Sequence, residues 1–439
     1  MKTSLVLTLP VLLFSTAVVA CSDAEQEGVA TQTDEILAAD KPAAVESEAP
    51  EASAPLESTG PPVADAELAA FRTDLLDLAF EAASAFPLKP HLKNRSAAQD
   101  RVVATSFALE LPRRAVRYAE GIENWRRGAA FADFAYYAAE RGDLRELDQY
   151  LNLAREVVRE TVAADDQAWR SDRIRAKIAR THILIGQDRE AAAITIGLEE
   201  SESGIVYEEN VQQLTEEQFD AEYEGIVAAI DDGAMETVSA SLSVCLALID
   251  RFYESEERRE KVTELLPRAW PNIPAQLQLE NVLTLARTAL RHDDPQSAAE
   301  YVSQAEEITS TWKWLPESEV PFLASIANLK VEAGAVEEAR ALADRARAVF
   351  EKDFQLVADV FRAETLVPLA ETYAALGDLE TARAIYLRAM HEGTLNPNAR
   401  PRCDALVLVC CSLAEAGVEP DAELWAKLRE TRAGLTRPW

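Results

Sequence analysis

The feature of this sequence that most constrains its fold is a glycine that returns at one place in a repeating helical pattern. From about residue 65 onward, apolar residues follow the spacing of amphipathic helices. Five of the 15 glycines fall between two such helices, and neighbours in the uninterrupted stretches are 40 to 44 residues apart. They are Gly142, Gly186, Gly334, Gly377 and Gly417. Because one helix pair cannot bury its apolar faces alone, the pattern predicts helix pairs stacked on one another.

The composition agrees with a helical fold and excludes two classes of protein. Apolar residues make up 48% of the 439 residues, which is enough to bury a core. The low glycine count and the 7% of aromatic residues argue against an all-β protein. The net charge of −32 argues against nucleic-acid binding, because phosphates are bound by clusters of lysine and arginine.

Two segments carry most of the negative charge. Residues 22–65 hold eleven acidic residues and one lysine, and Glu190 to Asp250 holds fifteen acidic residues without lysine or arginine. The stretch from Glu199 to Glu224 is either a solvated acidic surface or a surface for a cation or a basic partner. Since it lacks the regular spacing of a calcium loop, we favour the solvated surface.

One copy of the pattern, from Glu364 to Met390, resembles the tetratricopeptide repeat (TPR). It has that family's large, small, aromatic and glycine positions in order: Leu369, Ala370, Tyr373, Gly377, Ala382, Tyr386 and Ala389. The resemblance implies two antiparallel helices that pack closely at the alanines. The family's period is about 34 residues, so longer helices or longer linkers are needed here, and HEAT-type repeats of about 40–47 residues are the alternative.

Acidic residues are predicted to shape the turns. Asp293 stands where a turn glycine is expected, Asp378 is placed to cap the helix after Gly377, and Asp143 and Glu146 have the spacing of a capping box. We therefore predict an all-α fold: a curved α-solenoid of TPR-like antiparallel helix pairs over residues 66–439. Its first helix is expected from Asp65 to Phe86, and its inner surface is expected to be concave.

The N-terminus predicts export and anchoring. Residues 1–20 have a positive Lys2 and a short apolar core, as in a secretory signal peptide. The sequence Val18-Val19-Ala20-Cys21 resembles the lipobox of bacterial lipoproteins, which implies a diacylglycerol on Cys21 and cleavage before it. An ordinary signal peptide is the alternative. Ser22 implies sorting to the outer membrane, facing the periplasm. Residues 21–65, acidic and rich in proline and alanine, are predicted to be a disordered tether.

Candidate binding residues come from placing the repeat on its inner face. They are Tyr136, Arg173, Arg180, Arg287, Arg291, Asn328, Glu332, Glu364 and Glu371. Four arginines in the middle repeats are followed by acidic residues in the later ones. We hypothesise a groove that is positive in the middle and negative at the end and binds an extended acidic or mixed-charge segment; ordinary solvated helix faces are the alternative.

No signature of catalysis is present in the sequence. It lacks a phosphate-binding glycine loop, G-x-S-x-G, C-x-x-C and H-E-x-x-H. The four histidines fall in different segments, so no metal site and no cofactor are predicted. Cys410 falls at a small core position, and Cys411 points toward the inner face as the better candidate for a free thiol. We expect no enzyme activity.

The function predicted is that of a lipid-anchored scaffold of the bacterial cell envelope. Its partner is expected to be a protein or peptide, basic or mixed in charge, and not nucleic acid. The alternative is a glycan- or nutrient-binding envelope lipoprotein built on TPR-like repeats. The close pair Trp312 and Trp314 is the candidate for sugar stacking, and the low aromatic content counts against it.

Overall fold

The structure, a computed structural model, describes residues 58–164 and 167–439. The predicted signal peptide, Cys21 and residues 22–57 of the predicted tether lie outside the described residues. Within the described ranges the chain has helices and no strand. The prediction of an all-α solenoid is confirmed.

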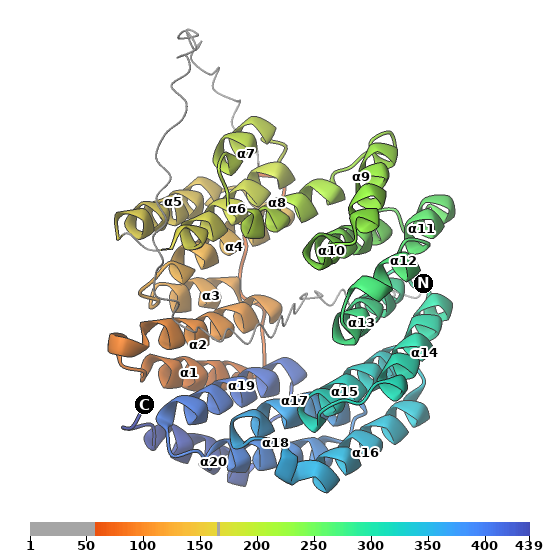
Figure 1. The fold of residues 1–439 in the computed structure, drawn as a ribbon. Coiled ribbons are helices and arrows are strands. Elements are labelled where there is room, and N and C mark those ends of the chain that lie inside the picture. The colour runs from red at the N-terminus through yellow and green to blue at the C-terminus, as the bar shows by residue number, and fades with distance from the viewer. Residues whose placement is uncertain (1–57, 165–166) are drawn as a thin grey trace, which may run out of the picture. The chain divides into compact units, whose positions relative to one another are not determined.

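The helices follow one another with short connections (Figure 1). The first part contains α1 (Ala70–Ser84), α2 (Leu88–Ala108), α3 (Pro112–Ala119), α4 (Arg126–Glu140), α5 (Leu147–Ala163), α6 (Ala168–Leu184) and α7 (Asp188–Thr195). The middle contains α8 (Glu200–Gln212), α9 (Phe219–Asp232), α10 (Met235–Arg251), α11 (Glu256–Thr263) and α12 (Leu266–Ala269). The last part contains α13 (Ala275–Arg291), α14 (Pro295–Thr311), α15 (Pro316–Glu332), α16 (Val336–Asp353), α17 (Asp359–Ala375), α18 (Leu379–Gly393), α19 (Ala399–Ala416) and α20 (Ala422–Ala433).

Successive helices pack as antiparallel hairpins, most regularly from α13 to α20. The first helices of these hairpins begin at Ala275, Pro316, Asp359 and Ala399, which gives a period of 40 to 43 residues. The helices themselves account for this period, because α15 and α16 occupy 17 and 18 residues. Together they already exceed the 34 residues of a TPR.

The turn residues adopt the conformation predicted for them. All five predicted turn glycines have a positive φ, which ranges from 65° at Gly417 to 82° at Gly334. Asp293 takes the same left-handed conformation with φ of 54°, although aspartate is strained there. Asp378 caps α18 by accepting a hydrogen bond of 3.2 Å from the amide of Thr381, as predicted.

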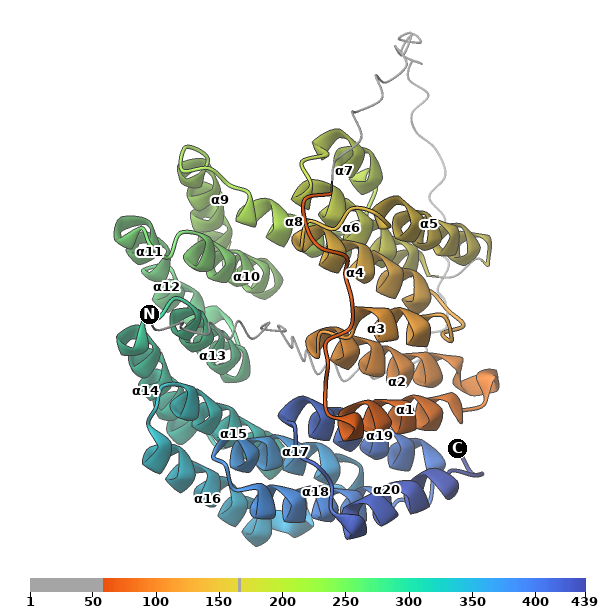
Figure 2. The same cartoon turned by 180° about the vertical axis from the view of Figure 1, so that it is seen from behind.

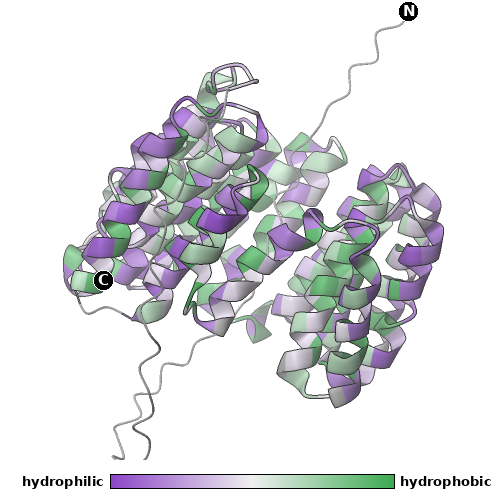
Figure 3. Ribbon diagram, turned by 90° about the horizontal axis from the view of Figure 1, so that it is seen from above, coloured by the Kyte–Doolittle hydropathy of each residue, from purple (hydrophilic) through white to green (hydrophobic). Residues whose placement is uncertain are grey.

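Packing of the small residues explains the close approach of the hairpins. Tyr373 and Tyr386, the two aromatic positions of the repeat, are buried together with Ala370, Ala382 and Ala389. Apolar and polar residues both occur on the helices (Figure 3), as expected where helices pack against a core on one side. One large apolar core includes residues of α1 to α6 and of α13 to α20, and a separate core fills the middle of the chain from α8 to α14.

The two ends of the solenoid meet. α1 packs against α19, so the helices follow one another around a closed path (Figures 1 and 2). The Arg72 side chain donates hydrogen bonds of 2.6 Å and 3.1 Å to the backbone oxygens of Ala414 and Glu415, at the end of α19. At the other end of the same contact, the Cys403 thiol donates to the backbone oxygen of Ala82 at 3.3 Å. The sequence pattern did not predict this closure.

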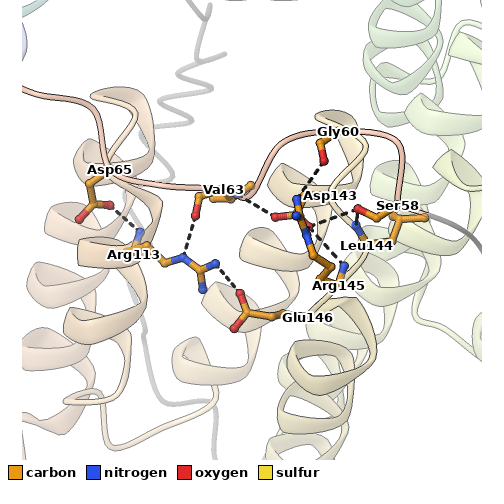
Figure 4. A network of polar contacts seen from close by, with 9 residues as sticks. All are labelled: Ser58, Gly60, Val63, Asp65, Arg113, Asp143, Leu144, Arg145 and Glu146. Carbon is orange, nitrogen blue, oxygen red and sulfur yellow. Dashed lines mark hydrogen bonds and ion pairs between the residues drawn. The ribbon is translucent and has the colours of Figure 1, made fainter.

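An extended segment, Ser58 to Ala69, precedes α1 and lies across the turns of two hairpins (Figure 4). The amides of Thr59 and Gly60 donate to the backbone oxygen of Gly142 at 3.0 Å and 2.8 Å. The Val63 amide donates to Asp143 Oδ2 at 2.7 Å. The compact unit therefore begins at Ser58, and the boundary predicted after residue 65 falls inside a docked segment.

This segment also corrects two predictions about acidic residues. Asp143 does not close a capping box with Glu146, because its carboxylate binds the Val63 amide and, at 2.7 Å, the Arg145 side chain. These contacts hold the pKa of Asp143 below its usual value despite its burial. Asp65 lies before α1 and accepts a hydrogen bond of 2.7 Å from the amide of Arg113, in the first turn of α3. The first helix thus starts at Ala70.

None of the described helices is long and apolar enough to cross a membrane.

Candidate functional site

The predicted binding residues all lie on the first helices of hairpins, which pack against one another from hairpin to hairpin. Tyr136 is on α4, Arg173 and Arg180 on α6, Arg287 and Arg291 on α13, Asn328 and Glu332 on α15, and Glu364 and Glu371 on α17. Pairs seven residues apart on one helix are two turns apart and share a face. The structure divides eight of these nine residues, all except Asn328, into three groups.

The first group surrounds Arg180. Its guanidinium carbon lies 3.8 Å from the ring centroid of Tyr136, and Nη2 lies 3.4 Å from Asp133 Oδ1. The Tyr136 hydroxyl donates a hydrogen bond of 2.8 Å to Glu209 Oε2 on α8. Burial, and next the charge of Glu209, raise the pKa of Tyr136 far above its usual value. The phenol is therefore a fixed neutral donor in this group.

Arg173 is also neutralised from α8. Its guanidinium forms a two-point ion pair with Glu202, with Nη2 at 2.9 Å from Oε1. The Glu202 side chain is only 2% exposed, so its charge is compensated almost entirely by Arg173. Arg173 and Arg180 of α6 therefore have acidic partners and do not give the middle of the inner face a free positive surface.

The second group joins α13 to its neighbours. Arg291 Nη2 lies 2.9 Å from Asp250 Oδ1 on α10, which also contacts His292. Burial lowers the pKa of Arg287, while the charge of Glu332 on α15 opposes that shift. Burial likewise raises the pKa of Glu332, against the effect of Arg287. The charges of Arg287 and Glu332 therefore interact across neighbouring hairpins, and the charge of Arg291 is paired with Asp250.

The third group is a carboxylate cluster at the closure, which we define as Glu364, Glu371, Asp404 and Glu415. Glu364 and Glu371 are on α17, and Asp404 and Glu415 are on α19. Arg101 of α2 acts on Glu371, Asp404 and Glu415. Arg400 Nε also lies 3.9 Å from Asp404 Oδ2, and the charge of Arg72 acts on Glu415. Four carboxyl groups thus share three arginines, and this part of the inner face is acidic.

The carboxyl groups of this cluster are not equivalent. Burial raises the pKa of Glu371 to about 7, although Ser412 Oγ donates a hydrogen bond of 2.6 Å to Glu371 Oε1. The buried Tyr386 hydroxyl lies 2.7 Å from the same Ser412 oxygen, so a hydrogen-bonded chain connects a core tyrosine to the cluster. Burial also raises the pKa of Glu415 above its usual value, whereas the Asp404 side chain is 51% exposed.

Sequence reasoning missed Arg101, Asp404 and Glu415. Asp404 had a usable signal, because it lies 40 residues after Glu364, which is the interval between Gly377 and Gly417. Extending the repeat by one more hairpin places it on the inner face. Arg101 had no such signal, because α2 meets the cluster only where the two ends of the solenoid close and α2 packs against α19.

The remaining candidate residues have packed surroundings. The thiols of Cys245, Cys403, Cys410 and Cys411 are all free and buried, so Cys410 is a core thiol as predicted, and Cys411 is a free thiol but shares that state with the other three. Burial raises the pKa of Cys411 to about 12. Asn328 Oδ1 is buried and has no hydrogen-bond partner within the described part of the chain.

The predicted tryptophan pair does not share one environment. Trp314 stands edge-on to Phe322 with ring centroids 5.0 Å apart, and its indole donates to the backbone oxygen of Thr309 at 3.0 Å. Trp312 is 56% exposed. Two cavities, of about 290 Å³ and about 410 Å³, lie beside α16 to α18 and beside the extended N-terminal segment, away from the predicted inner-face residues. In the ranges that the structure describes, no group of histidine, cysteine and acidic residues is arranged to hold a metal ion.

Comparisons with known proteins leave the family open. No protein-family model matches the chain, and no curated protein matches it. Among solved structures, it is similar to one described as a "circular tandem repeat protein with novel repeat topology and enhanced subunit contact surfaces". The identity is 16%, the TM-score is 0.27, and the match covers 83% of this chain and 94% of the other. A likeness this distant carries no argument about function.

Proposed function

We propose that this chain is a TPR-like, lipid-anchored scaffold of the bacterial cell envelope that binds a basic or mixed-charge peptide segment of a partner protein on its inner face. The observation that carries the proposal is the carboxylate cluster, whose four carboxyl groups share Arg72, Arg101 and Arg400. A lysine or arginine of a partner would supply the missing positive charge. The arginines predicted for the middle of that face have acidic partners within the chain, so they do not present a positive surface that would repel such a segment.

Binding rather than catalysis is proposed, because helical solenoids act mainly by presenting extended surfaces. The proposal needs no cofactor. It also excludes nucleic acid as the partner, since phosphates would meet the same carboxylates. Glycan binding is the weaker candidate, because Trp314 is committed to packing on Phe322.

A charge-reversal experiment on the full chain tests the binding site. The probes are fluorescein-labelled decalysine and decaglutamate peptides, followed by fluorescence anisotropy. We expect decalysine to bind in a salt-dependent way and decaglutamate not to bind. The double variant Glu364→Lys and Asp404→Lys should weaken decalysine binding by at least about tenfold, since two exposed charges of the cluster are reversed.

The control must share the change in net charge without touching the inner face. Glu337→Lys combined with Glu351→Lys adds the same charge on the exposed side of α16. Binding should then fall only by the small effect of the changed net charge. An equal loss in both double variants would mean that decalysine responds to the total charge of the protein, and the cluster would not be the site.

The anchor is tested by covalent labelling rather than by membrane fractionation. In a bacterial host fed an alkyne analogue of palmitate, the full chain should take up the label, and Cys21→Ser should abolish it. Mass spectrometry should place the new N-terminus at Cys21. Cys245→Ser is the matched control, because it removes a different thiol, which is buried in the core. Label retained in Cys21→Ser would contradict the assignment of the lipidation site.

A further inference from the structure

Exposed apolar side chains are concentrated at one edge of the solenoid. We define the joining edge as the segments 312–319, 351–362 and 391–402, which lead from one hairpin to the next, together with 85–93 between α1 and α2 and the C-terminal segment 434–439. Among the described residues, seven of the twelve exposed large hydrophobic side chains lie on it, including Trp312, Leu315, Leu356, Phe361 and Leu395. Over the same hairpins, the opposite edge, where the glycine turns lie, has Val336 and Leu379.

The repeat places these side chains in register. Leu315, Leu356 and Leu395 are 41 and 39 residues apart and precede α15, α17 and α19 in turn. Their exposed fractions are 64%, 69% and 62%, and that of Trp312 is 56%. Isolated exposed hydrophobic residues are common on proteins. Here, however, a leucine is exposed at the same repeat position in three successive hairpins, so the three side chains form a row.

Polar contacts tie the joining segments into one continuous edge. The Asn396 side chain donates a hydrogen bond of 3.1 Å to Asp359 Oδ2 at the start of α17. Arg362 lies over the ring of Phe354 at 4.1 Å and pairs with Glu392 at 3.2 Å. Farther along, the Ala399 amide donates to the backbone oxygen of Pro438 at 2.7 Å, and the Trp439 and Phe86 rings are 4.9 Å apart. The edge is therefore continuous from the segment before α17 to the start of α2.

The charge of this edge differs from that of the whole protein. The five segments contain eight lysine and arginine residues and six acidic residues, against 44 and 76 in the whole chain. Lys89, Lys313 and Lys352 are exposed beside the apolar side chains. A protein with a large negative charge is repelled by anionic surfaces. The joining edge has more basic than acidic residues, so its own charges do not add to that repulsion.

From these observations we propose that the joining edge of α13 to α20 and α2 is a membrane-contacting surface that inserts Trp312 and the row Leu315, Leu356 and Leu395 into the lipid headgroup region. Tryptophan, leucine and lysine together are typical of residues at a bilayer interface, where the lysine stem is buried and its charge stays in water. Separate loops suit a bilayer, which accepts each side chain on its own, whereas a protein interface needs a contiguous desolvated core.

The inference extends the proposed function but has its own evidence. If Cys21 carries the lipid, the 36 residues from Ser22 to Glu57 can span up to about 120 Å when extended, enough for either edge to reach the membrane. Vesicle binding is therefore measured with residues 58–439, which lack Cys21. This unit contains the complete described cores and closes on itself, so it is expected to fold alone.

The test uses vesicles of phosphatidylethanolamine and phosphatidylglycerol and co-sedimentation of residues 58–439. We expect the unaltered unit to bind, and the variant with Trp312, Leu315, Leu356 and Leu395 all changed to serine to bind at least about tenfold more weakly. Val336→Ser with Leu379→Ser, which removes exposed side chains from the opposite edge, should bind as the unaltered unit does. Brominated lipids should quench a fluorescence component that is missing in Trp312→Phe.

Three outcomes would overturn the proposal. One is no binding of the unaltered unit to vesicles. The second is an equal loss of binding in the joining-edge variant and in the control of the opposite edge. The third is concentration-dependent self-association in the absence of vesicles that the joining-edge variant abolishes, because the row would then be covered by a second copy of the chain. Circular dichroism of each variant confirms that exposed substitutions leave the helices intact.

Discussion

Replacing Ala82 by glutamate is expected to open the closure between α1 and α19 and to lower the free energy of unfolding by about 3–5 kcal/mol. Ala82 is completely buried on α1, and its backbone oxygen accepts the hydrogen bond from the Cys403 thiol on α19. A glutamate there is too large for the contact and buries an unpaired charge. Denaturant unfolding followed by circular dichroism measures the change in stability.

The same variant should show how the solenoid depends on its closure. Hairpins in a solenoid mainly contact their neighbours, so most helices are expected to remain folded when α1 leaves α19. Amide hydrogen exchange should therefore rise in α1, α19 and α20 much more than in α13 to α16, and small-angle scattering should report a larger radius of gyration.

The control is on the same helix. Ala70→Glu introduces the same side chain at an exposed position in the first turn of α1, where a negative charge favours the helix. Its stability should stay within about 0.5 kcal/mol of the unaltered protein. Unchanged exchange of α1 and α19 in Ala82→Glu would show that the two helices do not depend on their mutual contact.

Local features of the fold were predictable from the sequence because their causes are local. The residue that ends a helix in the left-handed conformation can be recognised from the sequence within one helical turn. The turn between α13 and α14 could therefore be assigned to Asp293 although no glycine stands there. The closure between α1 and α19 could not be predicted in this way. Arg72 and Ala414 are 342 residues apart, and the amphipathic pattern of α1 does not indicate which helix it packs against. The sequence pattern predicts Asp143 as a helix cap because it contains only local information. The carboxylate of Asp143 instead accepts a hydrogen bond from the Val63 amide, 80 residues earlier in the sequence.

The candidate site shows the same division. Periodicity places Arg173 and Arg180 on one face of α6, but Arg173 pairs with Glu202 on α8, and Arg180 shares Asp133 on α4 with Lys177. Helical periodicity predicts on which face of its own helix a residue lies. It does not predict which residue of a neighbouring hairpin will contact it. Glu364 and Glu371 were assigned to the acidic end, and Arg101, which shares it, comes from the opposite end of the chain.

Replacing Glu371 by glutamine is expected to stabilise the protein at pH 8 by roughly 2–3 kcal/mol. Burial raises the pKa of Glu371 from 4.5 to about 7, so the folded state holds this proton more tightly than the unfolded state does. The stabilisation from the protonated carboxyl is complete below pH 4.5 and is lost as the pH rises through 7. At pH 8 the charged carboxylate is buried at a cost, which a neutral glutamine avoids while still accepting the Ser412 hydrogen bond.

The measurement is urea unfolding of both proteins between pH 4 and pH 8. Glutamine should have its full advantage at pH 8 and lose it between pH 7 and pH 4.5. Acidic groups whose pKa is lowered by their contacts, such as Asp294 and Asp378, are the same in both proteins and cancel in the difference. Glu364→Gln, an exposed change on the same helix, should shift stability by less than about 0.5 kcal/mol at every pH. A glutamine variant less stable than the unaltered protein at pH 8 would mean that an ionised Glu371 is well compensated, and the carboxylate cluster would then have no unmatched charge for a basic partner to satisfy.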